Sequence, residues 1–200
     1  MVTVKIAAEL EDIREDLSEI FVTNHESEFG FLFKEKYSEE KKQKIKRQLI
    51  EAFCHMFELD SFYVALGEEH AIGMMGISGN KKRAMNLDLK ELKKALGGKG
   101  KICYEKFKYI SYPISHYPDD TAFLEPIEIL PEFKDPSAEE ELINYVVADT
   151  PYKVYIAELY DDQEELLKVY KRCGFFEIER HLIKNDDSQR YSVILRKIKK

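Results

Sequence analysis

Apolar positions along the chain alternate between the two-residue period of strands and the spacing of three to four residues that marks helices. Segment 2–8 (VTVKIAA) alternates as a strand does, and segment 10–25 then carries apolar residues at helical spacing. A second helical stripe covers 38–58, and 61–79 reads as two strands around a polar turn at 67–70. The pattern therefore predicts a strand, two helices and a hairpin, in that order.

The rest of the chain alternates in the same way after an insertion around 84–118. Residues 87–110 begin as an amphipathic helix that should stop at Gly97 and Gly98, with a second helical segment after it, and a proline-punctuated connector follows. The remaining elements are a strand and helix within 122–147, a strand over 152–160, a helix over 161–174, and a hairpin of 176–183 and 190–198 around the turn 184–189. No internal repeat or interdomain linker interrupts this order, so we predict one domain over 1–200.

Two segments carry a family resemblance. LLKVYKRCGFFEIER (166–180) is similar to the A-x-x-L-Y-x-x-x-GF helix and strand of the GNAT superfamily of N-acetyltransferases, and FLEPIEILPEFK (123–134) resembles that family's YIE-x-x-x-V-x-PEYR strand. The order of elements also fits, and the insertion is similar to one seen in some members. The resemblance implies an α/β (α+β) fold with a mixed, mostly antiparallel sheet, helices on both faces, and a splayed pair of parallel strands.

The resemblance also implies direct transfer of acetyl from acetyl-coenzyme A to an amine, with a base for the ammonium proton and an acid for the thiolate. It assigns these roles to Glu125 and Tyr170. Glu128 competes with Glu125, because simple strand alternation puts the two carboxylates on opposite faces. A bulge at Pro126, which cannot donate to the ladder, would change that arrangement. An ordinary solvated carboxylate and a core tyrosine are the competing interpretations.

The coenzyme loop departs from the family pattern Q/R-x-x-G-x-G/A. Lys134 keeps a cation, but Ser137 and Glu139 replace small residues that let the backbone approach a pyrophosphate. Asp135 and Pro136 fit the N-cap and first position of a helix, and Ser137 with Glu140 fits a capping box. Weakened coenzyme binding is therefore expected. The full set of coenzyme-binding residues that the resemblance implies is Ile129, Leu130, Lys134, Asp135, Ser137, Ala138, Glu139 and Glu164, where the last replaces a family asparagine.

The composition limits the classes of partner that the protein is expected to bind. With 31 basic and 38 acidic residues the net charge is −7, which disfavours nucleic acid and acidic membranes and mildly favours a cationic partner such as an amine. Three scattered cysteines predict neither disulfides nor a CxxC site, and the five histidines lack metal-ligand spacing. The N-terminus does not read as a signal peptide and no run reaches the ~20 apolar residues of a membrane span, so the expected compartment is the cytoplasm.

Three functional hypotheses follow from these observations. The first is an N-acetyltransferase that uses acetyl-coenzyme A and a small-molecule or peptide amine, with a homodimer left open. The second is a non-catalytic binding or regulatory protein of the same fold, favoured by the altered loop. The third is a protein-interaction module without a coenzyme. The acceptor is not identified, because its pocket is expected to come from the least regular segments.

Overall fold

The computed structural model describes residues 2–68, 70–80, 82–111, 117–183 and 190–199. Its strands are β1 (Val2–Ile6), β2 (Phe62–Gly67), β3 (His70–Ser78), β4 (Thr121–Ile129), β5 (Val154–Tyr160), β6 (Phe176–Leu182) and β7 (Tyr191–Ile198). Its α-helices are α1 (Ile13–Asn24), α2 (Glu39–Phe53), α3 (Leu89–Leu96), α4 (Lys99–Phe107), α5 (Pro136–Asp149) and α6 (Glu164–Arg172). The predicted order of elements is confirmed within these ranges, while the 184–189 turn and residues 112–116 of the connector lie outside them.

The strands form a seven-stranded sheet in the order β1-β2-β3-β4-β5-β7-β6. Neighbouring strands are antiparallel except β4 and β5, which run parallel and are joined by the crossover helix α5. Helices α5 and α6 cover one face, and α1 packs on the other against β3 and β4. The predicted mixed, mostly antiparallel sheet with helices on both faces is therefore confirmed.

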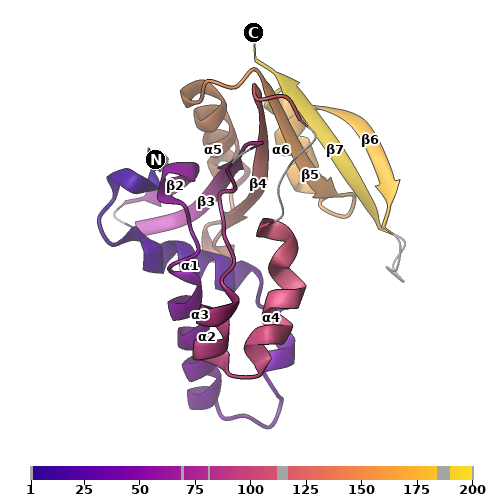
Figure 1. Ribbon diagram of the computed structural model, residues 1–200. Coiled ribbons are helices and arrows are strands. Elements are labelled where there is room, and N and C mark those ends of the chain that lie inside the picture. The colour runs from indigo at the N-terminus through magenta and orange to yellow at the C-terminus, as the bar shows by residue number, and fades with distance from the viewer. Residues whose placement is uncertain (1, 69, 81, 112–116, 184–189, 200) are drawn as a thin grey trace.

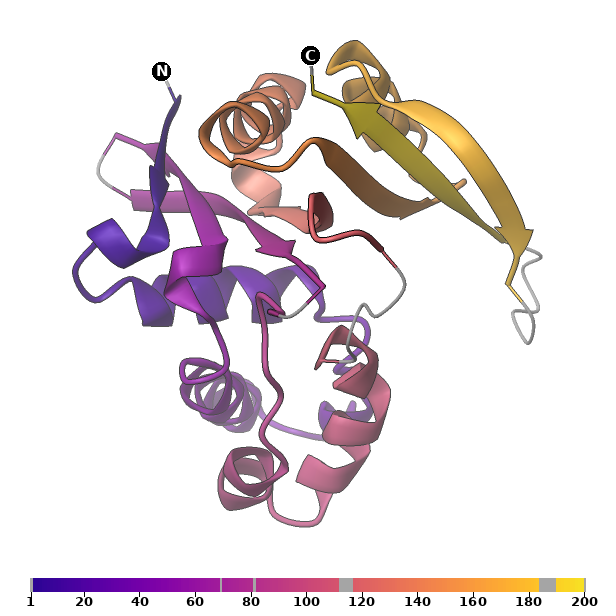
Figure 2. The ribbon, with the colours of Figure 1, turned by 45° about the horizontal axis from the view of Figure 1, so that its top comes forward.

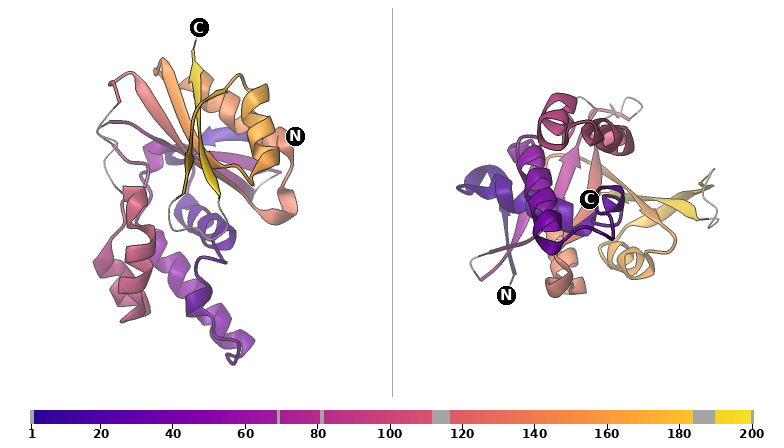
Figure 3. Two further views of the ribbon diagram at one scale, coloured as in Figure 1. Left: turned by 90° about the vertical axis from the view of Figure 1, so that its right-hand side faces the viewer. Right: turned by 90° about the horizontal axis from the view of Figure 1, so that it is seen from below.

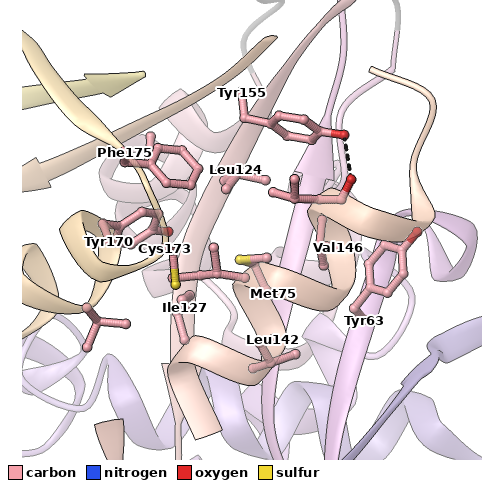
Figure 4. Close-up of a cluster of buried hydrophobic side chains, with 14 of the residues drawn as sticks. Tyr63, Met75, Leu124, Ile127, Leu142, Val146, Tyr155, Tyr170, Cys173 and Phe175 are labelled. Atoms are coloured by element: carbon pink, nitrogen blue, oxygen red, sulfur yellow. Dashed lines mark hydrogen bonds between the residues drawn. The ribbon is translucent and has the colours of Figure 1, made fainter. Parts of the chain in front are cut away.

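The remaining helices build a second layer away from the sheet. Helix α2 packs on α1, and α3 lies between α2 and α4, so these helices extend below the sheet in the views of Figures 1 and 3. One hydrophobic core fills the space between the sheet and α5 with α6; Figure 4 shows part of it. The other core joins α1, α2 and the insertion, and its buried phenylalanine rings are Phe21, Phe29, Phe53, Phe57, Phe62 and Phe107.

The parallel strands separate partway along their length. Pairing between β4 and β5 runs from Thr121 opposite Val154 to Leu124 opposite Ala157 and then stops, although β4 continues to Ile129. The predicted gap between these strands is confirmed. Beyond Leu124, one edge of β4 has no strand partner among the described residues.

A bulge on β4 lies at the point where the gap opens. Opposite β3, Met75 pairs with Ile127 and Ile77 pairs with Leu124, so two residues of β4, Glu125 and Pro126, face one residue of β3. Of the two alternatives left open by the sequence, simple alternation and a bulge at the proline, the bulge is the one that forms. The extra residue reverses the alternation, and it places the side chains of Glu125 and Glu128 on the same face of the sheet.

Close packing of β3 against β4 depends on a glycine. A Cβ at Gly73 would lie 2.2 Å from Cδ1 of Ile129 and 2.8 Å from the backbone oxygen of Glu128. The glycine here therefore permits the close approach of the two strands.

Between β3 and β4, the described part of the insertion is a tight pair of helices. Helix α3 ends where predicted, because Gly97 adopts a left-handed φ of 60°. A Cβ at Gly100 would lie 2.3 Å from the backbone oxygen of Leu92, so α4 starts against the end of α3. Phe107, at the end of α4, is buried in the helical core. The insertion therefore packs as part of this core.

Candidate functional site

Glu128 and His25 form a pair between β4 and the end of α1. The histidine is the C-cap residue of α1, and its Nε2 lies 2.9 Å from Oε1 of Glu128. The Glu128 side chain is 11% exposed and that of His25 19%. Phe21 and Phe107 pack on the imidazole, with ring centroids 4.5 and 5.7 Å away. A buried carboxylate thus has an ionisable partner on the α1 face of the sheet.

Burial and pairing shift the pKa values of both Glu128 and His25. Burial raises the pKa of Glu128, and the opposing effect of His25 is smaller. Burial alone would lower the pKa of His25, but the hydrogen bond to Glu128 and its charge outweigh burial and raise that pKa. The pair therefore holds a proton more strongly than either residue would in water.

Glu125, the residue predicted to act as the base, lies on the same face next to β3. The Ser78 hydroxyl donates a hydrogen bond to its Oε1, and Nη2 of Arg83 lies 3.0 Å from the same oxygen. Burial raises the pKa of this carboxyl, while Arg83 and Ser78 act in the opposite direction. Unlike Glu128, Glu125 has a partner with a permanent charge.

Tyr109 extends this cluster from the turn after α4. Its pKa is raised to about 12, first by desolvation and then by the charges of nearby groups that include Tyr160, Glu28, Glu128 and Glu125. The ring is 56% exposed. Tyr109 therefore lies within electrostatic range of both carboxylates and of Tyr160, at the end of β5.

The predicted helix cap forms at the start of α5. Asp135 is the N-cap of α5, and its Oδ1 accepts a hydrogen bond of 2.8 Å from the Ser137 amide. The Ala138 amide donates to the Asp135 carbonyl at 3.0 Å, and Pro136 has no amide hydrogen to offer. Of the two arrangements considered, the Asp135 cap forms. The Ser137 capping box is wrong, because Glu140 reaches Arg172 of α6 instead.

Two charges flank this helix start. Glu139 is 6% exposed, and burial raises its pKa although Lys134 and Arg172 act against that. Lys134 itself is exposed, and its charge also acts on Glu128. The loop thus presents a cation beside a buried carboxyl.

The end of β4 offers a different donor. Leu130 uses its amide within the sheet, where it donates to the Ile72 carbonyl at 2.8 Å. Because amides alternate between the two edges of a strand, the Ile129 amide points to the opposite edge, towards the gap. Ile129 therefore presents a main-chain donor where β4 lacks a strand partner.

The two remaining predicted residues, Tyr170 and Glu164, lie at opposite ends of α6. Tyr170 is fully buried, its ring packs perpendicular to that of Phe175, and burial raises its pKa. Figure 4 shows it near Cys173 in the core between the sheet and the helices α5 and α6. Glu164 starts the helix and is exposed. A role for either residue stays a prediction.

Sequence reasoning did not select His25, Ser78 or Arg83. His25 is separated from Glu128 by 103 positions, and Ser78 from Glu125 by 47. Neither pair falls within one element, so periodicity gives no signal for them. A search for ionisable residues next to helix ends would have included His25 at the end of its apolar stripe.

Neither a metal site nor a membrane-spanning helix is found among the described residues. No group of three or more histidine, cysteine, aspartate or glutamate side chains among them is placed to hold a metal ion. None of the helices in these ranges is long and apolar enough to cross a membrane.

Solved structures similar to this one over nearly its whole length are acetyltransferases. An N-acetyltransferase from Staphylococcus aureus matches with a TM-score of 0.60 at 13% identity, covering 97% of this chain and 99% of its own. The chain has the GNAT fold. A GNAT-family acetyltransferase from Bacillus cereus gives a TM-score of 0.57 at 13% identity, with coverages of 100% and 99%.

A third similar structure has a named acceptor. The ribosomal-protein-S18-alanine N-acetyltransferase of Escherichia coli matches at 10% identity with a TM-score of 0.50, over 98% of this chain and 92% of its own. No family model and no curated protein matches the sequence. At sequence identities of 10 to 13%, these similarities establish the fold of the chain.

Proposed function

We propose that this chain is an N-acetyltransferase that transfers acetyl from acetyl-coenzyme A to a small-molecule or peptide amine. The observation that carries the proposal is the opening between β4 and β5, with two buried carboxylates on one face of β4 beside it. Carboxylates in that position suit an ammonium acceptor, which they attract and from which a base must remove a proton. The free thiols of Cys54, Cys103 and Cys173 fit the reducing cytoplasm that we propose as its compartment.

Of the two carboxylates, Glu128 is better suited to accept the proton. Glu125 is held by Arg83, whose charge does not change near neutral pH, and this ion pair opposes protonation. Glu128 is paired with His25, which can itself lose a proton when Glu128 gains one. We therefore assign the base to Glu128, and we assign to Glu125 the attraction of the amine and support of the bulge.

The chain fits one part of the coenzyme better than the other. Acetyl-coenzyme A would supply the acetyl group as a thioester, and the open edge of β4 with the Ile129 amide suits its extended amide-containing arm. The loop fits the pyrophosphate less well, because Asp135 occupies the Ser137 amide and Pro136 lacks one. Lys134 is the residue left to hold the phosphates.

The altered loop favours a second candidate, a non-catalytic protein of the GNAT fold that has lost tight coenzyme binding. Calorimetric titration with acetyl-coenzyme A separates the two. Micromolar binding, followed by acetylation of members of an amine panel, supports the enzyme. Absence of binding and of product at millimolar coenzyme would contradict the enzyme and support the second candidate.

Replacing Glu139 with glycine is expected to tighten coenzyme binding. The change restores the small residue of the family pattern and removes a negative charge near the phosphates, a repulsion worth about 1 kcal/mol or more. The dissociation constant should fall roughly five- to tenfold at low salt, and less at high salt because the charge part is screened.

Glu141→Gly is the matched control for that measurement, because Glu141 is exposed on the same helix and the variant has the same change of charge. Equal tightening in both variants would mean that net charge alone acts. Loss of affinity in Glu139→Gly would contradict the assignment of the loop to the pyrophosphate.

Tyr170→Phe tests the proposed acid. The variant removes one hydroxyl from a buried ring, so coenzyme affinity should stay within twofold of the wild type. We expect kcat to fall about tenfold, which is less than the usual effect of proton transfer, because a thiolate leaves with little help from an acid. Steady-state kinetics, with a thiol reagent that detects released coenzyme A, measures kcat and the KM for acetyl-coenzyme A. An unchanged kcat in a variant of wild-type stability would remove Tyr170 from the mechanism.

A further inference from the structure

Three ionisable groups form a line from the interior to the surface. Glu128 lies at the inner end and is 8% exposed, and Nε2 of His25 is 2.9 Å from its Oε1. On the other side of the ring, Nδ1 of His25 lies 3.7 Å from Oε1 of Glu28, whose side chain is 49% exposed. The imidazole therefore connects a buried carboxylate with a solvated one through its two nitrogens.

A buried base must lose its proton to solvent in every turnover. We propose that His25 and Glu28 form the exit path that carries the proton taken by Glu128 to solvent. This inference rests on the proposed function, in which Glu128 accepts the proton of the ammonium acceptor. His25 and Glu28 are then positioning residues, since they act through Glu128 and not on the reacting atoms.

The path balances one proton in against one proton out. When Glu128 gains the ammonium proton, it loses the negative charge that favours the protonated imidazole of His25. His25 then releases its Nδ1 proton to Glu28, and Glu28 releases it to water. Loss of this proton leaves Nδ1 bare, while Nε2 keeps its proton towards Glu128. A half-turn of the imidazole then brings the bare nitrogen to Glu128, which transfers its proton to it. This transfer restores an ionised Glu128 beside a protonated ring, with no oxidant, reductant or further reactant.

The groups around the path belong to four other segments. Tyr109 acts electrostatically on both Glu28 and Glu128, and Lys134 acts on Glu128 from the loop after β4. Lys106 of α4 donates to the Glu28 backbone carbonyl at 3.4 Å. Phe21 and Phe107 contact the imidazole with apolar rings. The carboxylates of Glu128 and Glu28 thus lie next to the two imidazole nitrogens, and the rings of Phe21 and Phe107 pack against the rest of the imidazole.

The first test measures the His25 pKa by NMR titration, without any assay of activity. The imidazole signal, assigned by its loss in His25→Ala, should titrate above the ordinary value in the wild type. Glu128→Gln and Glu28→Gln should each lower this pKa, and Glu128→Gln more strongly because its oxygen is closer. Glu132→Gln, a change at an exposed residue of the same region, should leave it unchanged. An unchanged His25 pKa in Glu128→Gln would overturn the path.

The second test uses the full enzyme. His25→Ala should lower kcat roughly tenfold to a hundredfold, and free imidazole added to the assay should restore it in a saturable way. Because His25→Ala can loosen α1, Glu28→Gln is the second variant: its side chain is half exposed, so it should keep wild-type stability. We expect its kcat to fall roughly threefold to tenfold with KM for the amine unchanged.

His181→Gln is the matched control, because His181 lies 3.3 Å from Glu179 in an exposed pair and should keep wild-type kcat. Wild-type rates in both His25→Ala and Glu28→Gln would overturn the path and leave the proposed function intact. A wild-type protein that acetylates no amine would overturn both, and NMR coupling of the three groups would then locate the failure in the proposed function.

Discussion

Glu128→Gln is expected to lower kcat/KM for the amine by a factor of roughly 10² to 10³, because the amide cannot accept the ammonium proton. The two side chains have nearly the same size, and the amide can still hydrogen-bond with His25, so the fold should persist. The expected loss falls mainly on kcat, since the proton is removed during reaction. Steady-state kinetics at several pH values, with stability measured beside it, checks the result.

The pH dependence of kcat/KM is a second measurement that checks the role of Glu128. Glu128 must be ionised to act, so activity is lost as the pH falls through its pKa, and burial puts that pKa above the ordinary value for a glutamate. The acid limb of log kcat/KM should therefore lie higher than that of a solvated carboxylate. In Glu128→Gln this limb should vanish along with most of the activity.

Two further variants make the assignment specific. Glu132→Gln removes one negative charge from the exposed turn after β4 and should leave kcat within twofold of the wild type. Glu125→Gln should have an intermediate effect, because it breaks the contacts with Arg83 and Ser78. A larger loss in Glu125→Gln than in Glu128→Gln would return the base to Glu125, as the family resemblance alone suggests.

Phe107→Ala should destabilise the protein by about 3 to 5 kcal/mol, the usual cost of removing a buried phenylalanine ring. Phe107 is 2% exposed and stacks on Phe29 with a centroid distance of 4.8 Å. It also contacts Phe21, Phe53 and His25, so its loss leaves a cavity where the insertion meets α1 and α2. Urea unfolding, followed by far-UV circular dichroism, measures the change.

Ile102→Ala provides the comparison on the same helix. Ile102 is 50% exposed, so its truncation should change the free energy of unfolding by no more than about 0.5 kcal/mol. If Phe107→Ala cost no more than this control, the insertion would be a separate unit that contributes nothing to the core. A change in the slope against urea would indicate that the insertion unfolds independently.

The candidate site was only partly predictable from the sequence, and particular residues show why. Asp135 with Pro136 was predicted as a helix start, and the cap forms, because its hydrogen bonds span two or three residues. A bulge at Pro126 was considered as an alternative to simple alternation, because a proline cannot donate to the ladder at any register, and it forms. Its effect on Glu125 and Glu128 was left open, since the face of each side chain depends on how β4 pairs with β3.

Partners distant in sequence were not predictable. Glu128 was only a competitor of Glu125, and His25 was considered only as a metal ligand, because no short-range pattern relates the end of α1 to β4. Tyr170 fits both a core position and a site position on an amphipathic helix, and its complete burial was therefore a matter of packing. Glu140 was assigned to a local capping box, but it pairs with Arg172 of the neighbouring helix.

The sequence by itself determined the order of helices and strands and the helix start at Asp135, because hydrophobic periodicity and capping act within a few residues. Only the tertiary structure decided that both carboxylates of β4 face α1, that Glu128 is paired with His25, and that Arg83 holds Glu125. These contacts join residues 42 to 103 positions apart, and they form when the sheet, α1 and the insertion pack together. Burial in that packed region, and not any feature of the local sequence, raises the pKa values of the two carboxylates.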